Sequence, residues 1–420
     1  MFLLKFSWKN LTRHKRRTVI TAISLAVGLM MFILMDSMLV GAFEISNRNL
    51  MDAETGHGKI LTNLAFEDMK FSPLSNRIEN PDSIIKLVES NGAKASKRVV
   101  INGEIIYSNE YFPKEGSTQV LFTAVDLDSD NNVFNVMHEK NLVDGRFMEN
   151  GSDEVVIGSW LAEDIGAKVG SVFTLSLRTA SEGDDPGFYQ TIDVEIVGIV
   201  NVESPNVNRR VVYFPLDMAD FYLDLNGSVT EVAVKLPLNE TIDSFNKKIE
   251  STLPEGYGFF TWREIGADYL ALTEAKSGGS SIMMMLVIFI AIVGITNTIL
   301  MTINERQREL GMMRALGMSD KSIKLAFMIE AAGIGLIGAI SGVILGCLAN
   351  IPMVNIGIDF SSYMRHTDIG YRISNVMYGV WNFSAIFKAF IGGIIIPVIV
   401  AYFPTRSATK KSIPDCIHGR

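Results

Sequence analysis

Residues 18–40 read TVITAISLAVGLMMFILMDSMLV, an almost unbroken apolar run that directly follows three basic residues. A helix needs about 20 mostly apolar residues to cross a bilayer, because no backbone polar group can stay unpaired in hydrocarbon. Three further runs meet this requirement, at residues 282–303, 325–349 and 383–403. Buried helices of a soluble protein would fit runs of about 10 to 14 residues better. The sequence therefore predicts an integral membrane protein with four transmembrane helices.

The distribution of lysine and arginine predicts how these helices are oriented, because positive residues beside a span stay in the cytoplasm. Basic residues without acidic ones precede the first span, and others follow the second and fourth spans. Both termini are therefore predicted to be cytoplasmic. We divide the chain into a cytoplasmic segment (1–17), a first transmembrane helix (18–41), an extracytoplasmic domain (42–280) and a C-terminal membrane domain (281–420).

A cleaved signal peptide is the alternative for the first span, since it also joins basic residues to an apolar run. The apolar core of a signal peptide usually has about 7 to 15 residues, and this one is longer. We therefore expect an uncleaved signal anchor in a bacterial cytoplasmic (inner) membrane.

The extracytoplasmic block has the pattern of a mixed α+β domain, in which β-branched runs alternate with turn signals and helical segments. These β-branched runs predict strands at 98–101, 119–124, 154–157, 172–177, 194–200, 210–214 and 230–235. Helices are predicted at 83–90, 159–165, 216–223 and 242–253, and at 264–276, where a helix would run toward the second span. Cys347 and Cys416 both fall outside this block, so it cannot contain disulfides.

Composition and motifs exclude several functions. The net charge of −8 combines basic membrane edges with an acidic exterior, which does not fit a nucleic-acid partner. The sequence contains no G-x-x-x-x-G-K-[ST], G-x-S-x-G or H-E-x-x-H motif, and its five histidines are scattered. We therefore expect a non-catalytic chain without metal or cofactor of its own.

The connection after the second span, residues 304–318 (NERQRELGMMRALGM), stands out. Leu310, Met313 and Gly317 are spaced three and four apart, which predicts one face of a short amphipathic helix. Such a helix could dock into a groove on a cytoplasmic partner. A basic turn that only anchors the hairpin to lipid is the alternative.

At these residues the sequence resembles the coupling-helix signature of ABC transporter permeases of the MacB, LolC/LolE and FtsX type. The resemblance rests on Glu305-Arg306-x-Arg308-Glu309-Leu310-Gly311-x-x-Arg314-Ala315-Leu316-Gly317 and on the ending Tyr402-Phe403-Pro404-x-Arg406. The order of one span, a large outer domain and three spans also looks like this family. Residues 42–280 would then be a MacB-like α+β domain and residues 281–420 an FtsX-like permease domain.

The resemblance implies a permease that pairs with a second, identical or homologous permease and with cytoplasmic ATPase subunits, which would bind ATP and Mg²⁺. It also implies mechanotransmission, in which ATP-driven closure of the ATPases is passed along the helices to the outer domain. The contacts with the ATPase carried over by position are Glu305, Arg308, Glu309, Arg314 and Leu316.

Glycines in the third span predict close helix packing. Gly338, Gly342 and Gly346 are four residues apart, and small residues at this spacing let two helices approach closely in lipid. The charged residues Asp36, Glu330 and Lys388 lie near span ends, so we expect snorkelling or helix pairing rather than an ion pathway.

The cargo is predicted from resemblance to the lipoprotein-releasing LolC/LolE branch, carried by residues 48–60 and by Val155-Val-Ile-Gly. In that branch lipoproteins leave the inner membrane for a periplasmic carrier. Flexible apolar side chains would accept acyl chains in a cavity lined by Met30, Met31, Ile33, Leu34, Met283 and Met284. The corresponding carrier-binding loop is 179–190, with Glu182, Asp184, Asp185, Pro186 and Phe188; an ordinary hairpin loop is the alternative.

Two other functions fit the same sequence. One is MacB-like export of drugs or peptides. The other is mechanical signalling, in which the outer domain activates an extracytoplasmic hydrolase or sensor. Copurifying lipid or lipoprotein would indicate transport of an amphipathic cargo, whereas a soluble partner without lipid would indicate signalling.

Overall fold

The computed structural model describes residues 15–68, 74–178, 188–271, 285, 289, 292–294, 296–297, 300–360, 373 and 376–409. The chain divides into two compact units. The membrane unit comprises Met1–Phe43, Glu274–Ile358 and Met377–Arg420, and the β unit comprises Glu44–Thr273 and Asp359–Val376.

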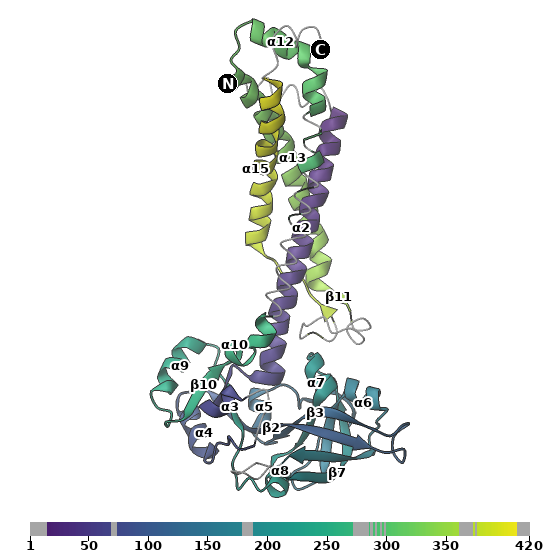
Figure 1. Ribbon diagram of the computed structural model, residues 1–420, viewed down its shortest axis with the longest axis vertical. Helices are drawn as coiled ribbons and strands as arrows, with labels where there is room; N and C mark the ends of the chain where they lie inside the picture. Colours follow the sequence, from purple (N-terminus) through teal and green to yellow (C-terminus); the bar gives the residue numbers. More distant parts are fainter. Residues whose placement is uncertain are drawn as a thin grey trace. The chain divides into compact units, whose positions relative to one another are not determined.

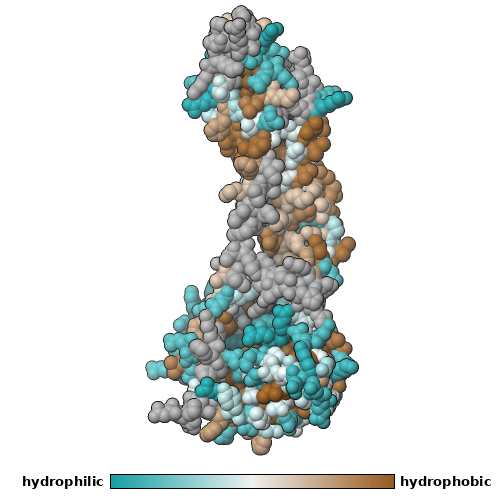
Figure 2. All heavy atoms as spheres, turned by 45° about the vertical axis from the view of Figure 1, so that its right-hand side comes forward, coloured by the Kyte–Doolittle hydropathy of each residue, from teal (hydrophilic) through white to brown (hydrophobic). Residues whose placement is uncertain are grey.

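The membrane unit is built on long apolar helices (Figure 1). Three helices of the described residues are long and apolar enough to cross a membrane. They belong to α2 (Lys15–Leu50), α13 (Asp320–Asn355) and α15 (Phe383–Ala408). Figure 2 shows apolar side chains gathered over these helices. Half of the second predicted span, 282–303, lies outside the described residues, and its described positions are helical.

The observed helices are longer than the predicted apolar spans, because their first turns include polar residues that follow a polar N-cap. Ser319 caps α13, with its side chain accepting a hydrogen bond from the backbone of Ser322 at 3.3 Å. The helix therefore begins at Asp320 instead of the predicted 325. Asn382 caps α15 in the same way, through the backbone of Ala385. A two-stranded sheet, β11 (Ile358–Asp359) and β12 (Val376–Met377), lies between α13 and α15 in the chain.

The predicted small-residue face of α13 lies against α2 of the same chain. A methyl group added at any of its three glycines would come within 3 Å of α2, at Gly338 against Leu25, at Gly342 against Ala26 and at Gly346 against Ile33. Real Cβ atoms do not tolerate such distances, so glycine lets these two helices approach. The side-chain amide of Asn382 donates to Asp36 at 2.9 Å, which links the start of α15 to α2.

The β unit contains short helices and ten strands among its described residues. Its helices and single turns are η1 (Met51–Thr55), α3 (Asn63–Glu67), α4 (Pro81–Ser90), α5 (Asp130–Val133), η2 (Glu139–Asn141), α6 (Ser159–Ile165), α7 (Pro205–Arg210), α8 (Leu216–Leu223), α9 (Ile242–Glu250) and α10 (Trp262–Ile265). Its strands are β1 (Gly58–Thr62), β2 (Lys94–Tyr107), β3 (Gly116–Val125), β4 (Leu142–Gly145), β5 (Glu154–Gly158), β6 (Val172–Arg178), β7 (Tyr189–Val200), β8 (Val211–Pro215), β9 (Glu231–Lys235) and β10 (Tyr257–Thr261).

Six of these strands close into a barrel. Strand β2 pairs with β3 and with β6, β3 pairs with β8, β8 with β5, β5 with β7, and β7 with β6. Alternate residues of these strands point into the barrel, where Phe122, Ile157 and Leu175 are fully buried. The opposite face carries a second cluster that includes Val156, Val211 and other valines.

The other half of β2 belongs to an open sheet. Residues 94–98 of β2 pair with β9, β9 pairs with β1, and β1 with β10. Helices α4 and α9 cover one face, on which Val88 and Phe245 pack into the same core as Ile60 and Val232. Strand β2 therefore joins the open sheet to the barrel.

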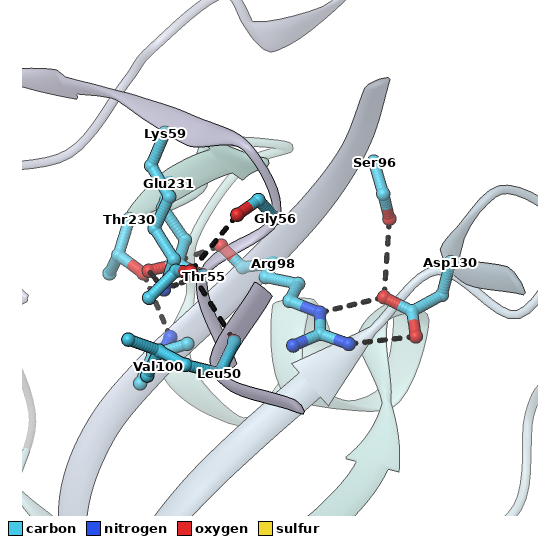
Figure 3. Close-up of polar contacts among 10 residues, drawn as sticks. All are labelled: Leu50, Thr55, Gly56, Lys59, Ser96, Arg98, Val100, Asp130, Thr230 and Glu231. Atoms are coloured by element: carbon cyan, nitrogen blue, oxygen red, sulfur yellow. Dashed lines mark hydrogen bonds and ion pairs between the residues drawn. The ribbon is translucent and has the colours of Figure 1, made fainter. Parts of the chain in front are cut away.

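Two buried ion pairs lie on the other face of this open sheet, where α5 packs against β2 and β9 (Figure 3). Arg98 stands where β2 passes from the sheet to the barrel, and its Nε and Nη2 donate to the two carboxylate oxygens of Asp130 at 2.7 and 2.8 Å. Lys59 Nζ lies 2.8 Å from Glu231, which is opposite Arg98 in the β2–β9 register. Burial opposes the charge of Arg98, but the ion pair with Asp130 raises its pKa.

The structure confirms all seven predicted strands and four of the predicted helices of the outer domain. Two strands are longer than predicted: β2 covers Lys94–Tyr107 instead of 98–101, and β7 begins at Tyr189 instead of 194. Strands β1, β4 and β10 were not predicted. The prediction of one helix over 264–276 was wrong in its start: α10 begins at Trp262, where Thr261 and Glu264 form a capping box, and a turn at Gly266 interrupts the helix. Residues beyond 271 of that segment lie outside the described residues.

Candidate functional site

The predicted coupling segment forms a compact elbow between the second and third predicted spans. Its helix, α12, covers Gln307–Ala315, shorter than the predicted 304–318. The helix ends there because Gly317 adopts a positive φ of 91°, a conformation that glycine adopts without strain. Gly317 is therefore part of the turn to α13 and does not share a helical face with Leu310 and Met313.

One side of the elbow is buried in the membrane unit. Leu310 is buried with Ile323 and Phe327 of α13 and with Val400 of α15, and Met313 packs against this cluster. These contacts join α12 to two long helices. A displacement of α12 would therefore be passed to α13 and α15 through apolar packing, because closely packed interiors transmit strain.

Ion pairs hold both ends of α12. Arg306 Nε lies 2.7 Å from Glu309, and its Nη1 lies 3.7 Å from Glu330 of α13. At the other end, Arg314 Nε lies 3.0 Å from Asp320, the first residue of α13. These contacts place two of the predicted ATPase contacts, Glu309 and Arg314, in pairs within the chain.

The opposite side of α12 is exposed. Arg308, Met312 and Leu316 follow each other at intervals of four residues, which places them along one side of the helix. The side chains of Met312 and Leu316 are 54% and 87% exposed. Glu305, just before the helix, is exposed as well. Met312 was missed in the sequence, although its spacing from Arg308 is the signal that could have identified it.

The residues predicted to line a cargo cavity do not share one environment. On α2, Ile33 is buried against Gly346, whereas Met31 is 53% exposed and Met30 and Leu34 are half-buried. Their exposures therefore differ along α2, and the cargo cavity stays a prediction. Met283 and Met284 lie outside the described residues.

The predicted carrier-binding loop connects β6 to β7, whose antiparallel pairing extends to Arg178 and Tyr189. Glu182, Asp184, Asp185 and Pro186 lie outside the described residues. Phe188, at the edge of the loop, is 72% exposed. The described residues contain no cluster of three histidine, cysteine or acidic side chains that could hold a metal ion.

Comparison with known proteins identifies the family. Residues 18–252 match the MacB-like periplasmic core domain, and residues 281–413 match the FtsX-like permease C-terminal domain. The chain belongs to the family of ABC transporter permeases that combine these two domains. It is a membrane protein with an extracytoplasmic domain.

Individual relatives are distant. An uncharacterized ABC transporter permease of Methanocaldococcus jannaschii is 22% identical over 99% of this chain and 98% of its own. The macrolide export ATP-binding/permease protein MacB of Pasteurella multocida is 26% identical over 53% of this chain and 33% of its own. The lipoprotein-releasing system transmembrane protein LolC of Neisseria meningitidis serogroup B is 23% identical over 47% of this chain and 48% of its own. These matches do not favour the LolC/LolE branch over MacB.

Proposed function

We propose that this chain is the permease subunit of an ATP-driven transporter and that a cytoplasmic ATPase docks on the exposed side of α12. The observation that carries the proposal is the two-sided character of this short helix. Leu310 is buried against α13 and α15, while Arg308, Met312 and Leu316 are exposed. A partner bound to the exposed side would push on a helix that is already fixed to the membrane unit.

The chemistry of this surface favours a protein partner over lipid alone. An almost fully exposed leucine beside a methionine and an arginine provides an apolar contact with a charged rim, and methionine and arginine are enriched at protein interfaces. In the proposed cycle the partner ATPase binds and hydrolyses ATP with Mg²⁺, and this chain transmits the movement to its outer domain. A second permease, identical or homologous, would complete the transporter.

The cargo is proposed at the level of chemical class. LolC and MacB are both relatives, so lipoprotein release to a periplasmic carrier and export of drugs or peptides are supported equally. An amphipathic substrate is common to both. The signalling alternative, activation of an extracytoplasmic hydrolase or sensor, uses the same mechanical transmission without a cargo.

The experiment is affinity capture of the tagged full chain from detergent-solubilised membranes of its own organism, with identification of a copurifying ATPase by its nucleotide-binding motif. Leu316→Glu and Arg308→Glu should each reduce recovery of the ATPase at least roughly tenfold, as expected for residues at the centre of an interface. Leu238→Glu is the matched control, because Leu238 is a fully exposed leucine of the β unit.

Arg314 is a poor choice for charge reversal, since its pair with Asp320 joins α12 to α13 and its loss would disturb the elbow itself. If Leu316→Glu and Arg308→Glu recovered as much ATPase as Leu238→Glu, docking on α12 would be wrong. If the wild-type chain came down alone and hydrolysed ATP, the proposed division of labour would be wrong.

A further inference from the structure

A cavity of about 280 Å³ lies within the β unit, on the outer face of the barrel. Its floor consists of alternate residues of three neighbouring strands: Arg98 and Val100 of β2, Leu121 and Thr123 of β3, and Val211 and Tyr213 of β8. Val100, Thr123 and Tyr213 are direct neighbours in register across these strands. The floor is therefore set by strand pairing and does not depend on a loop.

Two segments that lead along the chain to the membrane helices form much of the remaining lining, together with Lys59 of β1 and with Asn206 and Val207 of α7. Leu50, Ala53 and Thr55 belong to the end of α2 and to η1, and Ile265 and Tyr269 belong to the segment that continues toward the second predicted span. Leu50 and Tyr269 also pack together with Trp262. A molecule in this cavity would contact the barrel and both connecting segments at once.

Each of three largely buried residues of the floor has one polar atom without a hydrogen-bond partner among the described residues. The guanidinium of Arg98, which is held by Asp130, also lies 3.4 Å from the centroid of the Phe134 ring. Arg98, Thr123 and Tyr213 are 2%, 3% and 1% exposed, and all three line the cavity. Among the described residues, Nη1 of Arg98 and the hydroxyl groups of Thr123 and Tyr213 have no hydrogen-bond partner. Figure 3 shows this Arg98 nitrogen directed away from Asp130. Buried polar groups are normally hydrogen-bonded, so this convergence requires an explanation.

The lining has three other charged residues: Lys59 and Glu54, whose charges are paired or hydrogen-bonded within the protein, and Asp268, which is exposed. Lys59 is bound to Glu231, and Glu54 accepts hydrogen bonds from Ser204 at 2.6 Å and Asn206 at 2.9 Å. Burial raises the pKa of Tyr213, so its phenol stays protonated and can donate. The groups that remain for a ligand are thus a guanidinium N–H and two hydroxyl donors, surrounded by aliphatic side chains.

We propose that this cavity is a binding site for a small organic carboxylate with an apolar tail, whose oxygens accept hydrogen bonds from Arg98 Nη1, Thr123 and Tyr213. A charged acceptor suits a guanidinium donor, and such hydrogen bonds are stronger than neutral ones. The apolar tail would lie against Leu50, Ala53 and Ile265. A bound carboxylate would hold the two connecting segments against the barrel. Because these segments lead along the chain to the membrane helices, the site would act as a ligand sensor in the connection between the outer domain and those helices. This proposal goes beyond the docking of an ATPase and does not depend on it.

The test is ligand binding to the purified full chain in detergent, followed by thermal unfolding and by tryptophan fluorescence, since Trp262 is buried beside the cavity wall. The probes share one branched apolar tail: isovalerate, a simple carboxylate; L-leucine, a zwitterion; and isoamylamine, a cation without a carboxylate. We expect isovalerate or L-leucine to raise the unfolding temperature and isoamylamine to leave it unchanged. The better of the two carboxylates identifies a simple anion or an amino acid as the source.

Tyr213→Phe and Thr123→Val remove one unpartnered hydroxyl each and keep the shape of the side chain. Each should weaken carboxylate binding roughly tenfold without lowering the stability of the free protein, because no protein hydrogen bond is lost. Tyr222→Phe is the matched control, since the Tyr222 hydroxyl donates to Asp153 at an exposed site outside this cavity. The proposal is overturned if neither carboxylate binds at millimolar concentration, if only the amine binds, or if Tyr213→Phe and Thr123→Val bind as well as Tyr222→Phe.

Discussion

Replacement of Asp130 by asparagine tests how much the junction between sheet and barrel depends on a buried charge. The side chains of Arg98 and Asp130 are 3% and 2% exposed, and two hydrogen bonds join them. Removal of one partner of such a pair leaves the other charge buried without compensation, which typically costs about 3 to 5 kcal/mol. Glu231 lies opposite Arg98 and offsets part of this loss. We therefore expect the free energy of unfolding to fall by about 3 kcal/mol.

The neighbouring residue of the same strand provides the control. Lys97 pairs with Asp82 at 3.2 Å, but the side chain of Asp82 is 70% exposed. Exposed pairs contribute less than about 1 kcal/mol, so Asp82→Asn should hardly change stability. The two variants make the same chemical change and differ in burial.

Urea unfolding of the full chain in detergent measures both variants, in a background with Trp8 and Trp381 replaced by phenylalanine. The remaining tryptophans, Trp160 and Trp262, both belong to the β unit and are mostly buried. The combined variant Arg98→Met with Asp130→Leu should recover most of the lost stability, because both charges of this pair are removed together and neither is left buried alone. If Asp130→Asn cost no more than Asp82→Asn, the ion pair would contribute nothing beyond a surface contact and the reasoning would fail.

Two further changes test the membrane unit and the entry to the β unit. Gly342→Leu should separate α2 from α13 and lower the thermal stability of the full chain in detergent. Gly294→Leu should lower it less, since no described atom lies within 4 Å of a Cβ added there. Equal unfolding temperatures of the two variants would contradict the packing. Burial is the main cause that lowers the pKa of His57 below its usual 6.5, and the charge of Lys235 adds to it. The unfolded state therefore binds a proton at His57 more readily than the folded state does. The free energy of unfolding should fall as the pH drops below about 6.5, by at most about 1.4 kcal/mol per pH unit. His57→Gln should remove this pH dependence of stability, as measured by urea titrations at several pH values. His138→Gln, at an exposed site, is the control and should retain it. The opposite pattern would show that other titrating groups cause the pH dependence.

The parts of the fold that sequence predicts well are those with strong local patterns. Residues 172–177 alternate apolar and polar side chains and form β6, and residues 216–223 form α8 at the predicted bounds. Strands β1 and β4 are not predicted because they are short and their apolar residues are few: β1 begins with Gly58 and Lys59, and β4 reads LVDG. Closure of the barrel is not predicted either. The parallel pairing of β3 with β8 joins residues about ninety positions apart, and no local sequence pattern specifies such a pairing.

The candidate coupling site also has parts that the sequence predicts and parts that depend on tertiary structure. Its helix and its position between two spans follow from the sequence, and the resemblance identifies its contacts by position. Which of those contacts are available depends on tertiary structure: Arg308 and Leu316 are exposed, whereas Glu309 and Arg314 form pairs with Arg306 and Asp320. Each of these two residues has its partner within six residues in the sequence. This spacing alone does not predict the ion pairs, because the same residues could also be exposed and unpaired.

The ion pair of Arg98 and Asp130 can fix the register of strand β2, which belongs to both the open sheet and the barrel. Strand β2 pairs with β9 over residues 94–98 and with β3 over residues 98–107, so a slip of one residue would turn apolar side chains outward in both sheets. Arg98 is the residue shared by the two pairings, and its bidentate contact with Asp130 can form in one register only. Hydrophobic side chains at these positions would fill the same space but would tolerate neighbouring registers more easily. The double replacement of Arg98 and Asp130 should therefore restore the free energy of unfolding while slowing the return to a single folded form, which refolding kinetics followed at Trp262 can measure.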